Sequence, residues 1–159
     1  MLRFSVVNLV DELHAIAAAL TAAGIRYAVC GGVAVTIHGA TRSTVDLDVL
    51  VERTDLARTL EVVRPLGYSY AALPMIFDAG TVRERHVQRV SKLEGDEHLL
   101  LDLLLAEAAF AGALDDRIEI TPPGGPLAVV SRATLIRMKR LAGRTQDLAD
   151  LESLGATRE

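Results

Sequence analysis

Three aspartates have the types and spacing of a divalent metal site. Asp46 and Asp48 are two residues apart within residues 45–51, where Val45, Leu47, Val49 and Val51 would occupy the opposite face of a strand, and Asp102 interrupts a leucine run at residues 99–105. Residues two apart in a strand point to the same face, roughly 7 Å apart along the backbone. Clustered carboxylates repel one another unless cations neutralise them, and their oxygens are the ligands that Mg²⁺ prefers. The pattern predicts a magnesium site formed by Asp46, Asp48 and Asp102.

The surroundings of Asp102 leave a second interpretation open. Leucines on both sides of this residue predict a strand that is buried on both faces. An isolated ionised carboxylate there would carry a large desolvation penalty, so Asp102 needs a partner. That partner is either a cation shared with the other two acids or an arginine such as Arg85 or Arg89.

Gly31 and Gly32 follow an apolar stretch and precede residues 33–38, which are long enough for a short helix. A glycine pair that opens a helix lets backbone N–H groups approach a phosphate closely. Most glycine pairs are merely turns, so this signal gains weight only from its context.

The glycine pair, the helix, residues 42–49 and the later strand aspartate together resemble the DNA polymerase β-type nucleotidyltransferase superfamily. Within it, the chain is similar to the minimal nucleotidyltransferases, which include AbiEii-type toxins of bacterial toxin-antitoxin pairs. The resemblance covers about residues 25–105. It implies an α/β (α+β) fold, the minimal nucleotidyltransferase fold, with a mixed β-sheet flanked by helices. The chain length fits a single nucleotidyltransferase-like domain over residues 1–159.

The resemblance also implies roles for individual residues. Asp46 and Asp48 would hold magnesium, and Asp102 would complete the site and help to activate the attacking hydroxyl. Gly31 and Gly32 would hold the phosphates of an NTP, although the commonest form of the family has Gly-Ser there. The resemblance implies two Mg²⁺ ions, with Mn²⁺ as an alternative.

Two basic residues complete the predicted nucleotide site. Lys139 lies in residues 135–142, which resemble the helix that closes the nucleotide site in this branch, and Arg42 precedes the acid pair. Helical spacing allows another interpretation of Lys139, as a solvated lysine opposite an apolar face. Arg42 also belongs to a basic strip that could receive an acceptor phosphate or RNA, with Arg83, Arg85 and Arg89. Charges that protect an exposed strand edge would explain the strip equally well.

Hydrophobic periodicity and turn residues predict the elements that position these groups. We expect helices over about residues 6–23, 33–38, 56–64, 131–143 and 147–154, and strands over residues 25–30, 45–51, 82–92, 99–105, 118–120 and 127–130. The pair of strands at 82–92 and 99–105 is expected to form a hairpin.

Composition limits the partners and the compartment. The formal charge of −4 provides no broad basic field for nucleic acid, so an RNA would have to be held by a local patch. The single cysteine, Cys30, excludes an internal disulfide and reads as a small buried residue. We expect a cytoplasmic protein with no membrane span.

The sequence therefore predicts a metal-dependent nucleotidyltransferase that moves an NMP group from an NTP to a hydroxyl acceptor. The acceptor is RNA such as tRNA, a protein or a small molecule, and the chain could be the toxin of a toxin-antitoxin pair with a cognate partner protein. The alternative is a catalytically inert nucleotidyltransferase-like binding or antitoxin subunit. A nucleotide-sugar glycosyltransferase using Asp-x-Asp ranks last, because it requires a longer chain.

Overall fold

The structure, a computed structural model, describes residues 8–39 and 46–156. Within these residues it has five α-helices: α1 (Leu9–Ala22), α2 (Gly31–Ile37), α3 (Leu56–Val63), α4 (Arg132–Ala142) and α5 (Thr145–Ser153). The eight strands of the described chain are β1 (Tyr27–Cys30), β2 (Asp46–Val51), β3 (Tyr70–Ala71), β4 (Met75–Phe77), β5 (Arg85–Glu94), β6 (Glu97–Leu105), β7 (Ile118–Ile120) and β8 (Leu127–Val129). Short 3-10 turns occupy η1 (Arg53–Asp55), η2 (Arg64–Leu66) and η3 (Ala108–Phe110).

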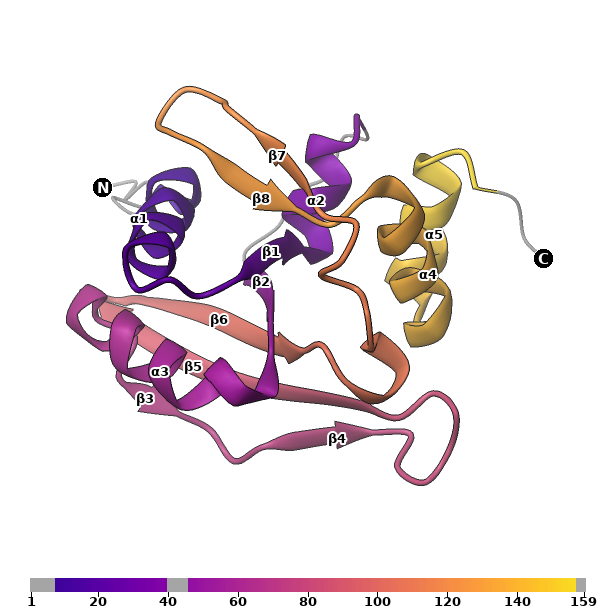
Figure 1. Ribbon diagram of the computed structural model, residues 1–159, viewed down its shortest axis with the longest axis horizontal. Helices are drawn as coiled ribbons and strands as arrows, with labels where there is room; N and C mark the ends of the chain where they lie inside the picture. The colour runs from indigo at the N-terminus through magenta and orange to yellow at the C-terminus, as the bar shows by residue number, and fades with distance from the viewer. Residues whose placement is uncertain (1–7, 40–45, 157–159) are drawn as a thin grey trace.

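All of these strands form one mixed sheet in the order β3-β5-β6-β2-β1-β8-β7, with β4 also paired to β5 (Figure 1). The pairs β2–β6 and β1–β8 are parallel, and the other pairs are antiparallel. The predicted mixed sheet flanked by helices is confirmed.

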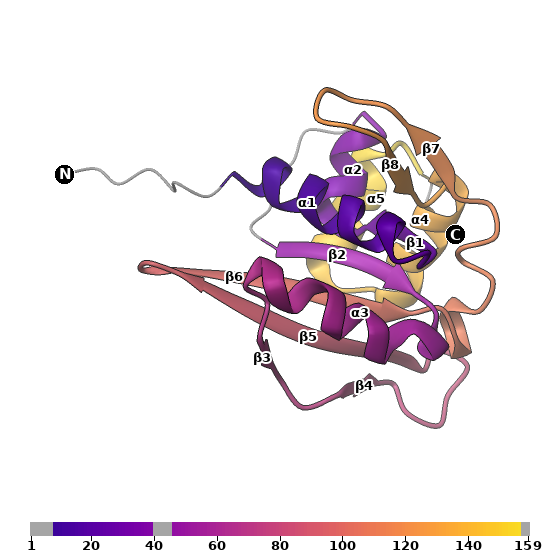
Figure 2. The same ribbon diagram turned by 60° about the vertical axis from the view of Figure 1, so that its left-hand side comes forward.

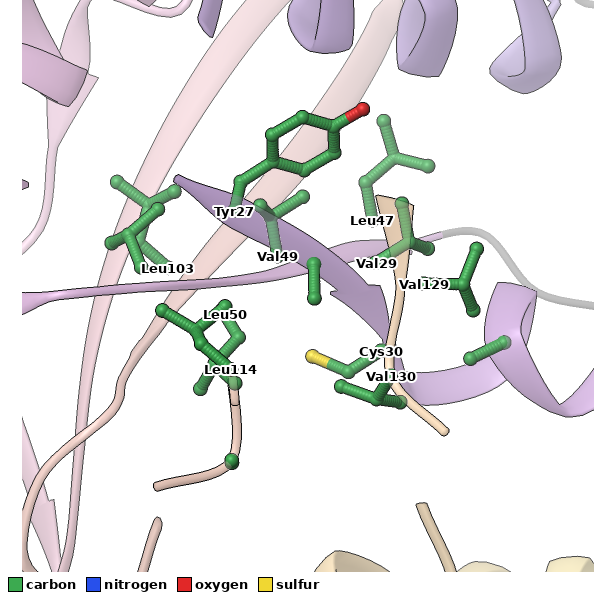
Figure 3. Packing of buried hydrophobic residues seen from close by; sticks show 14 of the residues in the cluster. Tyr27, Val29, Cys30, Leu47, Val49, Leu50, Leu103, Leu114, Val129 and Val130 are labelled. Atoms are coloured by element: carbon green, nitrogen blue, oxygen red, sulfur yellow. The ribbon is translucent and has the colours of Figure 1, made fainter. Parts of the chain in front are cut away.

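The two faces of the sheet have different coverings. Helices α1 and α3 cover one face, and α4 and α5 lie on the other (Figure 2). Around β1 and β2, Tyr27, Leu47 and Val49 lie on one side of the strands, whereas Cys30 and Leu50 lie on the other (Figure 3). All five are buried, so the middle of the sheet is a two-sided apolar core. A sheet fixed on both faces provides a rigid base for polar groups at the strand ends.

Capping residues define where α1 and α4 begin and where α4 ends. The side chain of Asn8 accepts a hydrogen bond from the backbone of Val10 and begins α1, and Ser131 does the same for α4 through Thr134. Gly143 adopts a left-handed conformation with φ of 64° and ends α4. These caps fix α4 at both ends, and α4 carries several of the residues described below.

Several predicted boundaries were wrong by a few residues. Helix α2 begins at Gly31 itself, α5 begins at Thr145, and β5 begins at Arg85 because residues 78–84 form hydrogen-bonded turns. The strands β3 and β4, which are two and three residues long, were not predicted. The start of the first predicted helix, at residues 6–7, lies outside the described residues.

The prediction that β6 is buried on both faces was wrong. Leu101, Leu103 and Leu105 are buried, but Leu100, Asp102 and Leu104 are only half-buried. The face that carries Asp102 therefore borders an open space. None of the helices in residues 8–39 and 46–156 is long and apolar enough to cross a membrane.

Candidate active site

The parallel pairing of β2 with β6 places Asp48 and Asp102 side by side. In this register Asp48 is the partner of Asp102, and Asp46 is the partner of Leu100. Side chains at partner positions point to the same face of a sheet, and so do residues two apart in one strand. Asp46, Asp48 and Asp102 therefore share the face that α4 and α5 cover.

Asp102 has a further partner on its other side. Arg89 of β5 is its register partner, and the guanidinium donates two hydrogen bonds to the carboxylate, from Nε to Oδ1 at 2.7 Å and from Nη2 to Oδ2 at 3.0 Å. These bonds also raise the pKa of the Arg89 guanidinium. The arginine partner considered from the sequence is thus present, in the same row as the acid pair. Asp48, Asp102 and Arg89 therefore form one row of partner residues across β2, β6 and β5.

The glycine turn lies directly against this row. Cys30, the last residue of β1, pairs with Asp48, so Gly31 follows at the point where the chain turns into α2. Gly31 has a φ of 65°, and a Cβ atom there would lie 2.0 Å from Oδ2 of Asp48. A side chain at Gly31 would therefore displace the carboxylate, and only glycine satisfies both the conformation and the space.

The electrostatic surroundings of Asp48 disfavour its charge. Burial is the largest cause, and together with the carboxylates of Asp102 and Asp46 it raises the pKa of Asp48 to about 7. The ammonium of Lys139 and the guanidinium of Arg144 oppose this rise. An aspartate whose pKa is raised by burial and by neighbouring carboxylates marks a position that favours a bound cation.

Helices α4 and α5 contribute a buried charge cluster. Lys139 is 7% exposed, and its Nζ lies 3.2 Å from Oδ1 of Asp147 and 2.9 Å from Oδ2 of Asp150. Asp147 also accepts a hydrogen bond from Nε of Arg144 at 2.8 Å. The interpretation of Lys139 as a solvated lysine was wrong. It joins the two helices from inside and still acts electrostatically on Asp48.

These groups border one cavity of about 340 Å³ between the sheet and the helices α4 and α5. Its polar lining comes from the turn, the acids and the basic residues: Gly31, Gly32, Asp46, Asp48, Arg85, Arg89, Asp102, Lys139, Arg144, Gln146 and Asp147. Its apolar lining comes from β4, β5, β6, η3 and α4: Met75, Phe77, Val87, Leu104, Phe110, Leu135, Met138 and Ala142. The fold thus gathers six of the seven residues predicted for the site around one cavity.

The donor set suits a divalent ion in part. Asp46 and Asp48 offer hard oxygen ligands in a pocket where negative charge is costly, which fits Mg²⁺. However, among the residues that the structure describes, no group of three or more acidic, histidine or cysteine side chains meets closely enough to hold an ion. The carboxylate of Asp102 is turned to Arg89, so a site shared by all three acids stays a prediction.

Two predictions about the arginines have different outcomes. Arg42 lies outside the described residues. Arg83, Arg85 and Arg89 do not form an open strip, because Arg85 is buried and bonded to Asp78 and Arg89 is bonded to Asp102. The strand that carries Arg85 and Arg89 is not a sheet edge either, since β3 and β4 pair with it.

Several cavity residues were missed from the sequence. Met75 and Phe77 belong to β4, whose apolar triplet between Pro74 and Asp78 was the available signal. Asp147 was expected only as the first residue of a last helix, and Gln146 was not assigned to any predicted element. Their approach to the acids depends on how α5 folds back on α4, which local periodicity does not determine.

Comparison with solved structures supports the fold class that the sequence predicts. The chain superposes on a predicted nucleotidyltransferase of Thermotoga maritima, TM1012, with a TM-score of 0.61, 12% identity, and coverage of 91% of this chain and 90% of that chain. It superposes on ANT(2'')-Ia, solved in complex with adenylyl-2''-tobramycin, with a TM-score of 0.58, 18% identity, and coverage of 92% and 87%. The protein therefore has a nucleotidyltransferase-like fold.

Sequence comparison is less informative. No protein-family model matches the chain. A stretch of 110 residues, 60% of this chain, is 34% identical to part of the DNA mismatch repair protein MutS of Anaeromyxobacter dehalogenans (strain 2CP-C), and it spans only 12% of that protein. A match of this extent assigns no family to the chain.

Proposed function

We propose that this protein is a Mg²⁺-dependent nucleotidyltransferase that moves an NMP group from an NTP to a hydroxyl acceptor. The observation that carries the proposal is the in-register pair of Asp48 and Asp102 next to the Gly31 turn. The nucleotidyltransferase-like fold supports it, because the chain superposes over most of its length on TM1012 and ANT(2'')-Ia.

In the proposed reaction, the acceptor oxygen attacks the α-phosphorus of the NTP. A new oxygen–phosphorus bond forms, and the bond from the α-phosphorus to the oxygen bridging to the β-phosphorus breaks. Pyrophosphate leaves with the bonding electron pair. The hydroxyl proton passes to the carboxylate of Asp102, which releases it to water afterwards.

The chain's own residues have distinct tasks in this scheme. The backbone of Gly31 and Gly32 approaches the phosphates, and Lys139 and Arg144 supply positive potential on the same side of the acids. Asp46 and Asp48 would hold Mg²⁺, with Asp102 nearby. The ion, when bound, would neutralise charge on the triphosphate and the leaving oxygen. Arg89 positions the carboxylate of Asp102.

The test is transfer of label from α-³²P-labelled NTPs in the presence of Mg²⁺ and total RNA, cell protein or a panel of hydroxyl compounds. Asp48→Asn and Asp102→Asn are the matched variants, and Asp96→Asn in the exposed β5–β6 turn is the control. We expect transfer by the wild type and the control, and a loss of about 100-fold or more in the two site variants. Equal labelling by all four proteins would overturn the proposal.

An inert nucleotidyltransferase-like subunit is the second candidate. It is favoured by the Arg89 pair, which occupies the Asp102 carboxylate. Calorimetric titration with nonhydrolysable NTPs and Mg²⁺ separates the two candidates. No binding at millimolar ligand would favour the inert subunit, in which case the chain would act through a partner protein.

The biological setting is also a proposal. ANT(2'')-Ia is described with an adenylylated tobramycin product, so small hydroxyl compounds are one acceptor class. RNA such as tRNA, or a protein, is another, and a toxin role with a cognate antitoxin in the cytoplasm agrees with the sequence resemblance. An adjacent reading frame for a small partner protein would support the toxin-antitoxin assignment.

A further inference from the structure

One wall of the cavity is an apolar shelf formed by Met75, Phe77, Val87 and Leu104. Three of these residues form a row across neighbouring strands, because Met75 pairs with Val87 and Val87 pairs with Leu104. Phe77 is the partner of Arg85, which precedes Val87 by two residues in β5. Phe77 is 42% exposed, and the other three are half-buried, so the shelf presents apolar surface to the cavity.

The apolar shelf begins next to the reactive acids. Leu104 follows Asp102 by two residues in β6, and Val87 precedes Arg89 by two residues in β5, so both pairs share a face. Two residues along a strand correspond to about 7 Å. A molecule on the shelf therefore has one end within reach of Asp102.

The position of the shelf relative to the glycine turn fixes which reactant it meets. Across the sheet the order is β1 with the Gly31 turn, β2 with Asp48, β6 with Asp102, β5 with Arg89, and then β4. The attacking and leaving oxygens of phosphoryl transfer lie roughly in line on opposite sides of the phosphorus. If pyrophosphate leaves towards Gly31, the acceptor hydroxyl must come from the side of the shelf.

The charges around the shelf define the chemistry of that acceptor. Arg85 is bonded to Asp78 at 2.8 Å and lies over the Phe77 ring at 5.6 Å, while Arg89 is bonded to Asp102. The cationic groups at the shelf are thus neutralised by their own partners. A polycationic acceptor would have to compete with these guanidinium groups for the carboxylates of Asp78 and Asp102, whereas an uncharged apolar body would cover Phe77, Val87 and Leu104 favourably.

We infer that the acceptor is an uncharged hydroxyl compound whose flat, apolar body rests on the shelf of Met75, Phe77, Val87 and Leu104. This inference rests on the proposed function and narrows its acceptor class. It separates the chain from enzymes that modify polycationic aminoglycosides.

The experiment measures binding without turnover. In protein with ¹³C-labelled methionine, valine and leucine methyl groups, NMR spectra are recorded with 2-phenylethanol as the apolar probe and tobramycin as the polycationic probe. We expect 2-phenylethanol to shift the methyl signals of Met75, Val87 and Leu104, and tobramycin to leave them unchanged. Shifts caused by tobramycin alone, or by neither probe at millimolar concentration, would overturn the inference.

A pair of variants on β4 makes the assignment specific. Phe77→Ser removes the aromatic surface of the shelf, and Ile76→Ser is the matched control, because Ile76 is 58% exposed on the same strand and does not line the cavity. Phe77→Ser should weaken 2-phenylethanol binding about 5- to 10-fold, and Ile76→Ser should change it less than about twofold. Equal weakening by both variants would contradict the inference.

The NMR binding experiment is independent of the label-transfer assay. Label transfer with unmoved shelf signals would reject the acceptor assignment and leave the proposed function intact. Shifted shelf signals without label transfer to any acceptor would reject the proposed function and leave an apolar binding site.

Discussion

Asp48 and Asp102 occupy partner positions on the parallel strands β2 and β6, although they lie far apart in the chain. Neither residue is exposed, and the negative charge of Asp102 contributes to the raised pKa of Asp48. The relationship places a carboxylate of near-neutral pKa beside the glycine turn.

The first prediction concerns how the free energy of unfolding depends on pH. The pKa of Asp48 is raised from an ordinary value of 3.8 to about 7, so between these values the folded protein binds more protons than the unfolded chain. The contribution of Asp48 to the stability of the folded protein is therefore fully present below about pH 4 and is lost as the pH rises through about 7. We expect the free energy of unfolding without Mg²⁺ to fall by roughly 2–4 kcal/mol from pH 4 to pH 8 through this residue.

Urea denaturation across that pH range checks this expectation. Asp48→Asn should flatten the decrease, and the surface control Asp96→Asn should retain it. If Asp48→Asn followed the same curve as the wild type, the raised pKa would be wrong. Added Mg²⁺ should recover stability mainly at pH 8, where Asp48 is ionised.

The second prediction concerns the contact between Gly31 and Asp48. Gly31→Ala introduces a Cβ atom 2.0 Å from the carboxylate and keeps a φ of 65° that favours glycine. Gly24→Ala is the matched control, because Gly24 has a φ of 71° and no heavy atom within 4 Å of an added Cβ. We expect Gly24→Ala to cost about 1 kcal/mol and Gly31→Ala to cost about 2 kcal/mol more.

Thermal and urea unfolding of both variants measure the difference. Gly31→Ala should also abolish the transfer activity under the proposed function, whereas Gly24→Ala should not. Equal costs for the two substitutions would show that the close approach of Gly31 to Asp48 does not exist in solution.

The third prediction concerns the Arg89–Asp102 pair. Arg89→Met leaves a poorly exposed carboxylate without its two hydrogen bonds, which should cost about 1–3 kcal/mol at pH 8. Asp102→Asn in the same chain removes the uncompensated charge, so the double variant should be more stable than the sum of the single changes predicts. A double-mutant cycle in urea gives the coupling energy, expected at about 1–2 kcal/mol. A coupling near zero would mean that the pair is not formed.

The fourth prediction concerns Lys139. Lys139→Met leaves Asp147 and Asp150, which are 1% and 2% exposed, without a buried ammonium between them. Breaking a buried ion pair from one side costs about 3–5 kcal/mol. Arg137→Met on the exposed face of the same helix is the control and should change stability by less than about 0.5 kcal/mol. Similar unfolding midpoints for the two variants would contradict the buried position of Lys139.

The sequence by itself determined the features that depend on near neighbours. A period of two placed Asp46 and Asp48 on one face, the glycine pair marked the turn into α2, and Ser131 and Gly143 marked the ends of α4. Strand periodicity, helix periodicity and capping act over a few residues, so they can be recognised in the sequence without knowledge of the fold.

Only the tertiary structure decided what each of these groups meets. The register of β2, β6 and β5 turned Asp102 towards both Asp48 and Arg89, and the return of α5 onto α4 buried Lys139 between two acids. The same register placed Met75, Val87 and Leu104 in one apolar row. Pairing between distant strands depends on the packing of the whole core, because a shift of one residue would turn every side chain to the opposite face.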